Sequence, residues 1–131
     1  MKEYLEQQLK KKAHELVMIT FRIVARSKGQ KGAAISLRQT VAKIPMSIFE
    51  GQARDFDEDK IRYFSGARSA VFEARYYLDI LYNGEAITYY SYRQVASRLD
   101  LLDKVLVSRV TSIDKRKAKD QYRSSIKARY I

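Results

Sequence analysis

Cysteine and tryptophan are both missing from this sequence of 131 residues, which also has one proline and five glycines. Without cysteine the chain can form neither a disulfide nor a thiolate metal site, and this composition fits a reducing compartment. We therefore expect a cytoplasmic location. The shortage of proline and glycine argues against a turn-rich β architecture and favours helices.

Long hydrophobic runs are also missing. The best apolar run, residues 16–25, is interrupted by Thr20 and Arg22, so the sequence predicts no membrane-spanning helix. The opening residues Met-Lys-Glu-Tyr do not resemble a signal peptide. At this length we expect a single domain that can bury a core.

Four stretches carry apolar residues at helical spacing, within residues 3–27, 33–50, 55–83 and 91–113. Short loops between such stretches predict an all-α, up-down-up-down four-helix bundle over residues 1–113. The expected core positions are Leu9, Ala13, Leu16, Thr20 and Ile23; Leu37, Val41, Ile44 and Ile48; Phe64, Ala67, Val71, Ala74, Leu78 and Leu81; and Val95, Leu99, Leu102, Leu106 and Ile113.

Local signals predict where these helices bend and end. Pro45 should kink the second helix or divide it in two, because proline removes a hydrogen bond and clashes with the preceding turn. Gly51 is expected to stop that helix. Asp55 is expected to begin the third helix as part of a capping box, with Asp57 as the alternative cap. Gly84 is expected to end it in a left-handed conformation.

The first and fourth helices have more apolar residues than one bundle core needs. Such a surplus favours self-association. The additional residues are Val17, Phe21 and Val24 on the first helix, and Leu101, Val105 and Val110 on the fourth.

Positive charge gathers at the two ends of the chain. The 26 basic and 15 acidic residues give a net charge of +11, divided as +7 over residues 1–54, −1 over 55–113 and +5 over 114–131. A polyanion is therefore the first partner to consider. We expect the basic tail, residues 114–131, to be disordered until it meets a partner, although a short helix or a tail that only aids solubility are alternatives.

Clusters of lysine and arginine are the candidate contacts to nucleic-acid phosphates, because each neutralised phosphate releases counterions and adds sequence-independent affinity. The alternative is that the charge only keeps an assembly soluble. Tyrosines around the third loop could stack on single-stranded bases or simply pack against one another. The candidate phosphate contacts are Lys10, Lys11, Lys12, Lys28, Lys31, Lys115, Arg116, Lys117, Lys119, Arg123, Lys127 and Arg129.

Groups for catalysis are scarce. His14 is the only histidine, so one chain can assemble neither a histidine pair nor a two-histidine metal site. The acidic residues from Asp55 to Asp59 are better explained by the positive end of a helix dipole than by Mg²⁺. Gly29 and Gly32 do not form a phosphate-binding loop, because no strand precedes them. We therefore expect no enzymatic activity, no metal and no cofactor.

One motif carries a family resemblance. Arg38 and the stretch Ile-Pro-Met-Ser-Ile-Phe-Glu-Gly, which includes Pro45, Ser47, Glu50 and Gly51, resemble the second-helix signature of the bacterial proteins named for 23S rRNA intervening sequences. In that signature asparagine usually stands where this chain has Ser47. Glu50 is expected to pair with Arg38 or to cap a neighbouring backbone group.

The resemblance implies a four-helix bundle that assembles as a homopentamer. It also implies a relationship to the accessory protein of diversity-generating retroelements, which works with a reverse transcriptase and its RNA. The leading hypothesis is therefore a non-enzymatic, oligomeric RNA- or DNA-binding accessory protein, with a reverse transcriptase as a candidate partner. The alternative is a homo-oligomeric scaffold whose partner is another protein.

Overall fold

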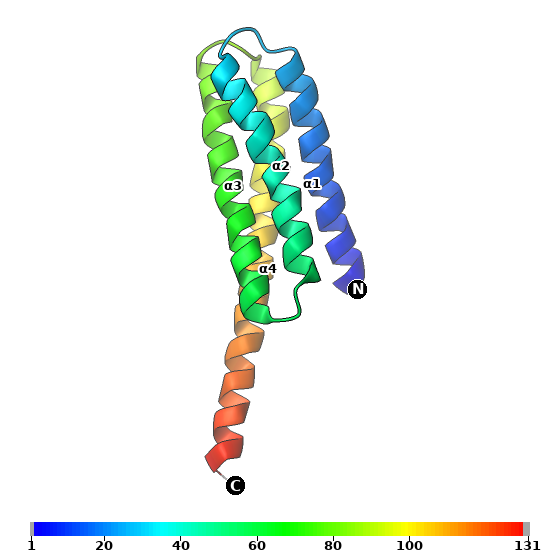
Figure 1. The fold of residues 1–131 in the computed structure, drawn as a ribbon, viewed down its shortest axis with the longest axis vertical. Helices are drawn as coiled ribbons and strands as arrows, with labels where there is room; N and C mark the ends of the chain where they lie inside the picture. Colours follow the sequence, from blue (N-terminus) through cyan, green and yellow to red (C-terminus); the bar gives the residue numbers. More distant parts are fainter. Residues whose placement is uncertain (1, 130–131) are drawn as a thin grey trace.

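The computed structural model describes residues 2–129, which form four α-helices joined by short loops (Figure 1). The helices are α1 (Lys2–Ala25), α2 (Lys31–Ala53), α3 (Asp57–Asn83) and α4 (Tyr89–Arg129). Each helix packs against its neighbours in sequence, and α1 also packs against α4. The structure confirms the predicted up-down-up-down four-helix bundle. The α1–α2 and α3–α4 loops share one end of it, and the α2–α3 loop lies at the other (Figure 1).

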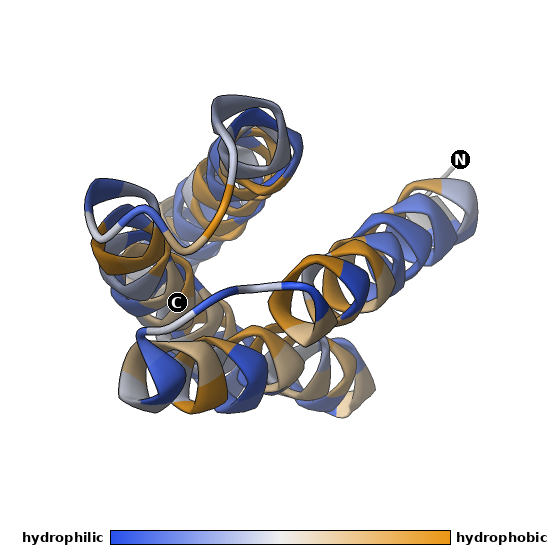
Figure 2. Cartoon of the chain, turned by 90° about the horizontal axis from the view of Figure 1, so that it is seen from above, coloured by the Kyte–Doolittle hydropathy of each residue, from blue (hydrophilic) through white to orange (hydrophobic). Residues whose placement is uncertain are grey.

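The predicted core positions are buried, apart from Ile23, which is partly buried. Figure 2 shows the reason in the view along the bundle, where each helix carries both hydrophobic and hydrophilic residues. The buried hydroxyl of Thr20 donates to the carbonyl oxygen of Leu16 at 2.7 Å, so its polar group is satisfied inside the core. Most of the additional apolar residues of the first and fourth helices, which we call the surplus stripes, are buried or partly buried in the bundle. Among their members Leu101 alone is exposed, at 44%.

Helix α2 continues on both sides of Pro45, which is buried within it, so the proline does not divide the helix. The bend at Pro45 stays a prediction. The prediction that Gly51 ends this helix is wrong, because α2 runs on to Ala53. Two contacts explain the position of Gly51. A Cβ atom there would lie 2.8 Å from the ring of Phe64, and Lys60 Nζ donates to its carbonyl oxygen at 3.4 Å, close to the end of the helix.

The start of α3 also differs from the expected capping box. Phe56 is the N-cap residue and makes no side-chain cap hydrogen bond, so the N-cap position is taken by neither Asp55 nor Asp57. The carboxylate of Asp57 instead binds Arg116 of α4. The acidic first turn still opposes the positive end of the helix dipole, as expected.

At the end of α3, Gly84 has φ −84° and is not left-handed; Glu85 takes that conformation instead, with φ 60°. The Ala86 N–H donates to Leu81 O at 2.8 Å and the Glu85 N–H donates to Tyr82 O at 3.0 Å. These two bonds form a Schellman motif with a glutamate in the place that glycine usually takes. The predicted helix end is right, but the left-handed residue was assigned one position too early.

The basic tail is helical. Ile113 is the last buried residue of the described chain, and α4 continues from there to Arg129, projecting beyond the bundle (Figure 1). The expectation of a disordered tail is therefore wrong for residues 114–129, and the alternative of a helix is what the structure shows. Residues 130–131 lie outside the described residues. After Gly84 the chain has no glycine or proline that would end the helix.

Candidate nucleic-acid interface

The predicted phosphate contacts lie towards both ends of the bundle. Lys10, Lys11 and Lys12 are exposed in the half of α1 nearest its N-terminus, and the tail projects from that same end (Figure 1). Lys28 and Lys31 are exposed at the other end, in the α1–α2 loop and the first position of α2. Helix α1 ends at Ala25, and at 1.5 Å per residue its stretch from Lys12 to that end holds the two groups about 20 Å apart.

Ion pairs are more frequent among the arginines of residues 55–113 than among the predicted phosphate contacts. In the middle, carboxylates neutralise most of the arginines: Arg62 pairs with Asp59, Arg68 with Asp103, Arg75 with Asp79 and Asp100, and Arg109 with Glu6. Within residues 2–129 the predicted phosphate contacts form no ion pair, with Arg116 and Lys117 as the exceptions. Apart from Arg116 and Lys117, the predicted phosphate contacts therefore have no internal counterion within the described residues and are accessible to an external anion.

Arg116 and Lys117 anchor the tail to the first turn of α3. Arg116 Nη2 lies 2.6 Å from Asp57 Oδ1 and its Nε lies 3.3 Å from Oδ2, a two-point contact. Lys117 Nζ lies 2.9 Å from Glu58 Oε1. The hydrogen bond from Lys117 lowers the pKa of Glu58, and the hydrogen bond to Asp57 raises the pKa of Arg116. Beyond this anchor the rest of the tail projects away from the bundle (Figure 1).

Sequence reasoning assigned Arg116 and Lys117 to phosphate and missed this anchor. The signal was present in the topology, because α3 begins and α4 leaves the bundle at the same end. The acidic first turn of α3 therefore meets the basic turn of α4 that leaves the bundle. Residues 59 apart in the chain give no local pattern that would reveal the contact.

One side of the tail, from Lys115 onward, carries a regular row of cations. Lys115, Lys119, Arg123 and Lys127 are exposed, follow each other at every fourth residue, and form no ion pair in the described chain. Residues four apart are neighbours on one helix face, and like charges at this spacing repel. A polyanion lying along this row, which we call the tail stripe, would relieve that repulsion.

The motif residues have structural roles. Glu50 binds Arg54 at 2.7 Å, so the expected pair with Arg38 is wrong. Arg38 instead places its guanidinium 4.8 Å from the centre of the Phe21 ring, which joins α2 to α1. The hydrogen bond with Glu50 raises the pKa of Arg54, whose guanidinium also donates to Tyr63 Oη at 3.1 Å. Glu50 thus contacts Arg54, and Arg54 joins the end of α2 to α3.

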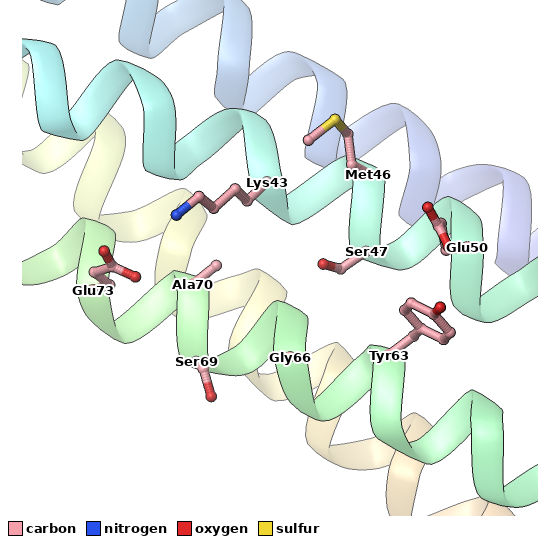
Figure 3. Close-up of a pocket in the computed structure, with 9 residues that line it drawn as sticks. All are labelled: Lys43, Met46, Ser47, Glu50, Tyr63, Gly66, Ser69, Ala70 and Glu73. Atoms are coloured by element: carbon pink, nitrogen blue, oxygen red, sulfur yellow. The ribbon is translucent and has the colours of Figure 1, made fainter.

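A groove of about 290 Å³ runs between α2 and α3. Figure 3 shows Ser47 and Lys43 of α2 facing α3 across it, with Glu73 near the lysine and Tyr63 near Glu50. The small residues Gly66 and Ala70 leave it open on the α3 side. Its walls carry two carboxylates and one lysine, a balance of charge that disfavours a phosphate group.

The described chain brings no obvious catalytic set together. His14 is exposed on α1. Across residues 2–129 no group of three or more histidine, aspartate and glutamate side chains is placed to hold a metal ion. None of the helices in this part of the chain combines the length and apolar character needed to cross a bilayer.

The fold and the distribution of unpaired charge define a basic, antiparallel four-helix-bundle protein with a projecting C-terminal helix. The family model of the 23S rRNA-intervening sequence proteins matches residues 6–108. The chain therefore belongs to this family, as its second-helix motif indicated. The matched residues include Lys10–Lys12 of α1 and Lys28 of the α1–α2 loop, and the tail lies beyond them.

The chain is also similar to a protein of unknown function from the S23 ribosomal protein family of Bacteroides thetaiotaomicron, whose crystal structure is known. The TM-score is 0.75 at 18% sequence identity, and the similarity covers 82% of this chain and 98% of that one. At this identity the likeness shows the shared fold alone. Among curated proteins, none matches this chain.

Proposed function

We propose that this protein is a non-enzymatic, homo-oligomeric accessory protein that binds RNA or DNA through the basic ends of its chain. The observation that carries the proposal is the separation of paired from unpaired cations. Carboxylates neutralise Arg62, Arg68, Arg75 and Arg109 of the middle segment, whereas Lys10–Lys12, Lys28, Lys31 and the tail stripe have no carboxylate partner within residues 2–129.

Physical chemistry supports a nucleic acid as the partner. A flexible chain of phosphates can reach the exposed lysines of α1 and the tail stripe together, because both lie towards one end of the bundle. Each phosphate that is neutralised releases condensed counterions and contributes affinity without regard to sequence. Self-association would multiply these weak contacts and add avidity.

A homo-oligomeric scaffold for another protein is the second candidate. Large apolar side chains stay exposed on all four helices, among them Leu5 and Met18 on α1, Met46 and Phe49 on α2, Phe72 and Tyr76 on α3, and Leu101 and Val107 on α4. Such residues favour protein contacts. They also support oligomerisation, so this candidate differs from the first only in what the assembled protein binds.

A place beside a reverse transcriptase in a diversity-generating retroelement is the finer form of the proposal. Its support is the family membership together with the basic chain ends. Co-purification of this chain with a reverse transcriptase encoded beside its gene would test it.

The test of nucleic-acid binding is the salt dependence of affinity for a labelled RNA and a DNA of matching sequence. For six to ten phosphate contacts we expect affinity to fall by about 10³- to 10⁵-fold between 50 and 200 mM salt, with little sequence preference. Substituting Lys115, Lys119, Arg123 and Lys127 with glutamine should reduce the log–log slope by about 3 while leaving the anchor intact. Glutamine at Lys10, Lys11 and Lys12 should reduce it independently.

Lys104→Gln is the matched control, because Lys104 is an exposed cation of α4 outside the proposed contacts and forms no ion pair within the described chain. Its slope should equal that of the native protein. Absence of binding to either nucleic acid at 50 mM salt would refute the proposal and favour the protein scaffold.

A further inference from the structure

Three tyrosine rings form a cluster where α3 ends and α4 begins. The ring centres of Tyr82 and Tyr92 are 4.9 Å apart, and the ring of Tyr89 lies 5.8 Å from the first and 6.4 Å from the second. These distances are typical of interacting aromatic rings. We call this cluster, Tyr82, Tyr89 and Tyr92, the tyrosine platform.

The inner part of the platform is held in place by polar contacts. The Tyr92 hydroxyl donates to Asp79 Oδ1 at 2.8 Å, and the guanidinium of Arg75 lies 5.8 Å from the centre of the Tyr92 ring. Arg75 is itself paired with Asp100 of α4. These contacts hold Tyr92 in place, so a partner would meet a platform that is already ordered.

The outer part of the platform is open to solvent. Tyr89 is 61% exposed, and the adjacent Tyr90 is 73% exposed. A structural role explains Tyr92, whose hydroxyl and ring both have partners. It does not explain Tyr89, which keeps most of a large ring in water at the first position of α4.

Cations surround the platform. Arg93 is exposed one helical turn after Tyr89 and forms no ion pair in the described chain. The α1–α2 loop lies against the α3–α4 loop, because the Lys28 N–H donates to Ala86 O at 3.0 Å. This contact places Lys28 beside the loop that connects Tyr82 to Tyr89. Of the nearby acids, Asp79 is occupied by Tyr92, and Glu85 is exposed.

We propose that the tyrosine platform binds unpaired nucleobases, so that this end of the bundle takes a single-stranded segment of nucleic acid. This inference rests on the proposed function and names the form of nucleic acid that one site takes. Exposed aromatic rings beside basic residues are what single-stranded segments bind, with bases stacked on the rings and phosphates beside the cations. In a duplex the base faces are covered by neighbouring pairs and cannot reach a ring.

The decisive comparison uses two oligonucleotides of equal length and charge, a 12-nucleotide oligothymidylate and its abasic counterpart. The intact protein should bind the base-containing strand at least about fivefold more tightly, the lower end of the effect of one base–aromatic stack. Tyr89→Ala should remove this preference and leave the affinity for the abasic strand unchanged. Tyr89→Phe should keep the preference, because stacking needs the ring and not the hydroxyl.

Tyr4→Ala is the matched control, because Tyr4 is 59% exposed near the start of α1, at the opposite end of the bundle. It should keep the preference. Equal affinity of the intact protein for both strands would overturn the platform while leaving phosphate binding by the chain ends in place. Failure of both strands to bind at 50 mM salt would overturn both proposals. A smaller assembly in Tyr89→Ala with an unchanged base preference would show that the ring serves a protein interface and also overturn the platform.

Discussion

Gly51 shows how a single residue sets the fit between α2 and α3. The ring of Phe64, a fully buried core residue, lies where a side chain at position 51 would begin, with Tyr63 Cβ 3.1 Å from the same point. Glycine is thus retained inside a helix, where its flexibility normally costs stability, because the neighbouring helix occupies the space of its Cβ. The glycine of the family motif therefore has a packing role here.

We expect Gly51→Ala to lower the free energy of unfolding by about 1–2 kcal/mol, since overpacking against Phe64 outweighs the better helix propensity of alanine. Urea denaturation followed by circular dichroism measures the change. Gly66→Ala is the control, because a Cβ at this helical position meets no other atom within 4 Å. Gly66→Ala should be neutral or stabilising by up to about 1 kcal/mol. Equal effects of the two substitutions would contradict the packing role.

At the scale of elements, the anchor between the start of α3 and the tail determines where α4 leaves the bundle. The pairs Asp57–Arg116 and Glu58–Lys117 follow directly after Ile113, the last buried residue of the described chain. These ion pairs connect α4 to α3 just beyond the point where the hydrophobic packing of α4 ends. Because the ion pairs are partly exposed, salt and acid should both weaken them.

We expect the double substitution Asp57→Asn and Glu58→Gln to speed amide hydrogen exchange severalfold at residues 114–120 at pH 7. The native protein should show the same loss at low pH. Because the folded pKa of Glu58 is lowered, the stability from its pair is present above the unfolded pKa and disappears as pH falls through the folded value. Mass spectrometry of exchange, corrected for the intrinsic rate at each pH, would measure both effects.

Asp59→Asn provides the comparison for this experiment. Asp59 belongs to the same acidic first turn but pairs with Arg62 of its own helix. Its loss removes one of the three negative charges at the helix end without touching the tail. An equal increase in exchange at residues 114–120 in this variant would mean that the helix dipole, and not the anchor, orders the tail.

The four helices and their buried residues could be predicted from periodicity, because a bundle core repeats along each helix and needs no distant information. The helix caps could not be predicted in this way, because they depend on backbone angles and on partners from other elements. Lys60 of α3 caps α2, and Arg116 binds the carboxylate of Asp57, the alternative cap expected for α3. For the candidate site, the basic clusters were visible in the sequence, whereas the division into paired and unpaired cations required the topology.

For the whole molecule, the main expectation is assembly. We predict a homo-oligomer, with five copies as the first expectation, and in a pentamer the formal charge of +11 per chain would sum to about +55. Multi-angle light scattering at low micromolar concentration measures the mass. Leu101→Lys places a charge on the exposed member of the surplus stripes and should reduce the mass, whereas Tyr122→Lys in the tail should not. A native mass of 15.3 kDa, that of one chain, would contradict the prediction.

The projecting end of α4 also gives each protomer an unusual hydrodynamic character. At 41 residues, α4 is about 62 Å long, whereas a compact chain of 131 residues has a radius of gyration of about 14 Å. The protomer should therefore diffuse and elute as a larger particle than its mass implies. In small-angle X-ray scattering, the pair-distance distribution should fall slowly to a long maximum dimension, and removing residues 114–131 should shorten that dimension far more than it reduces the mass.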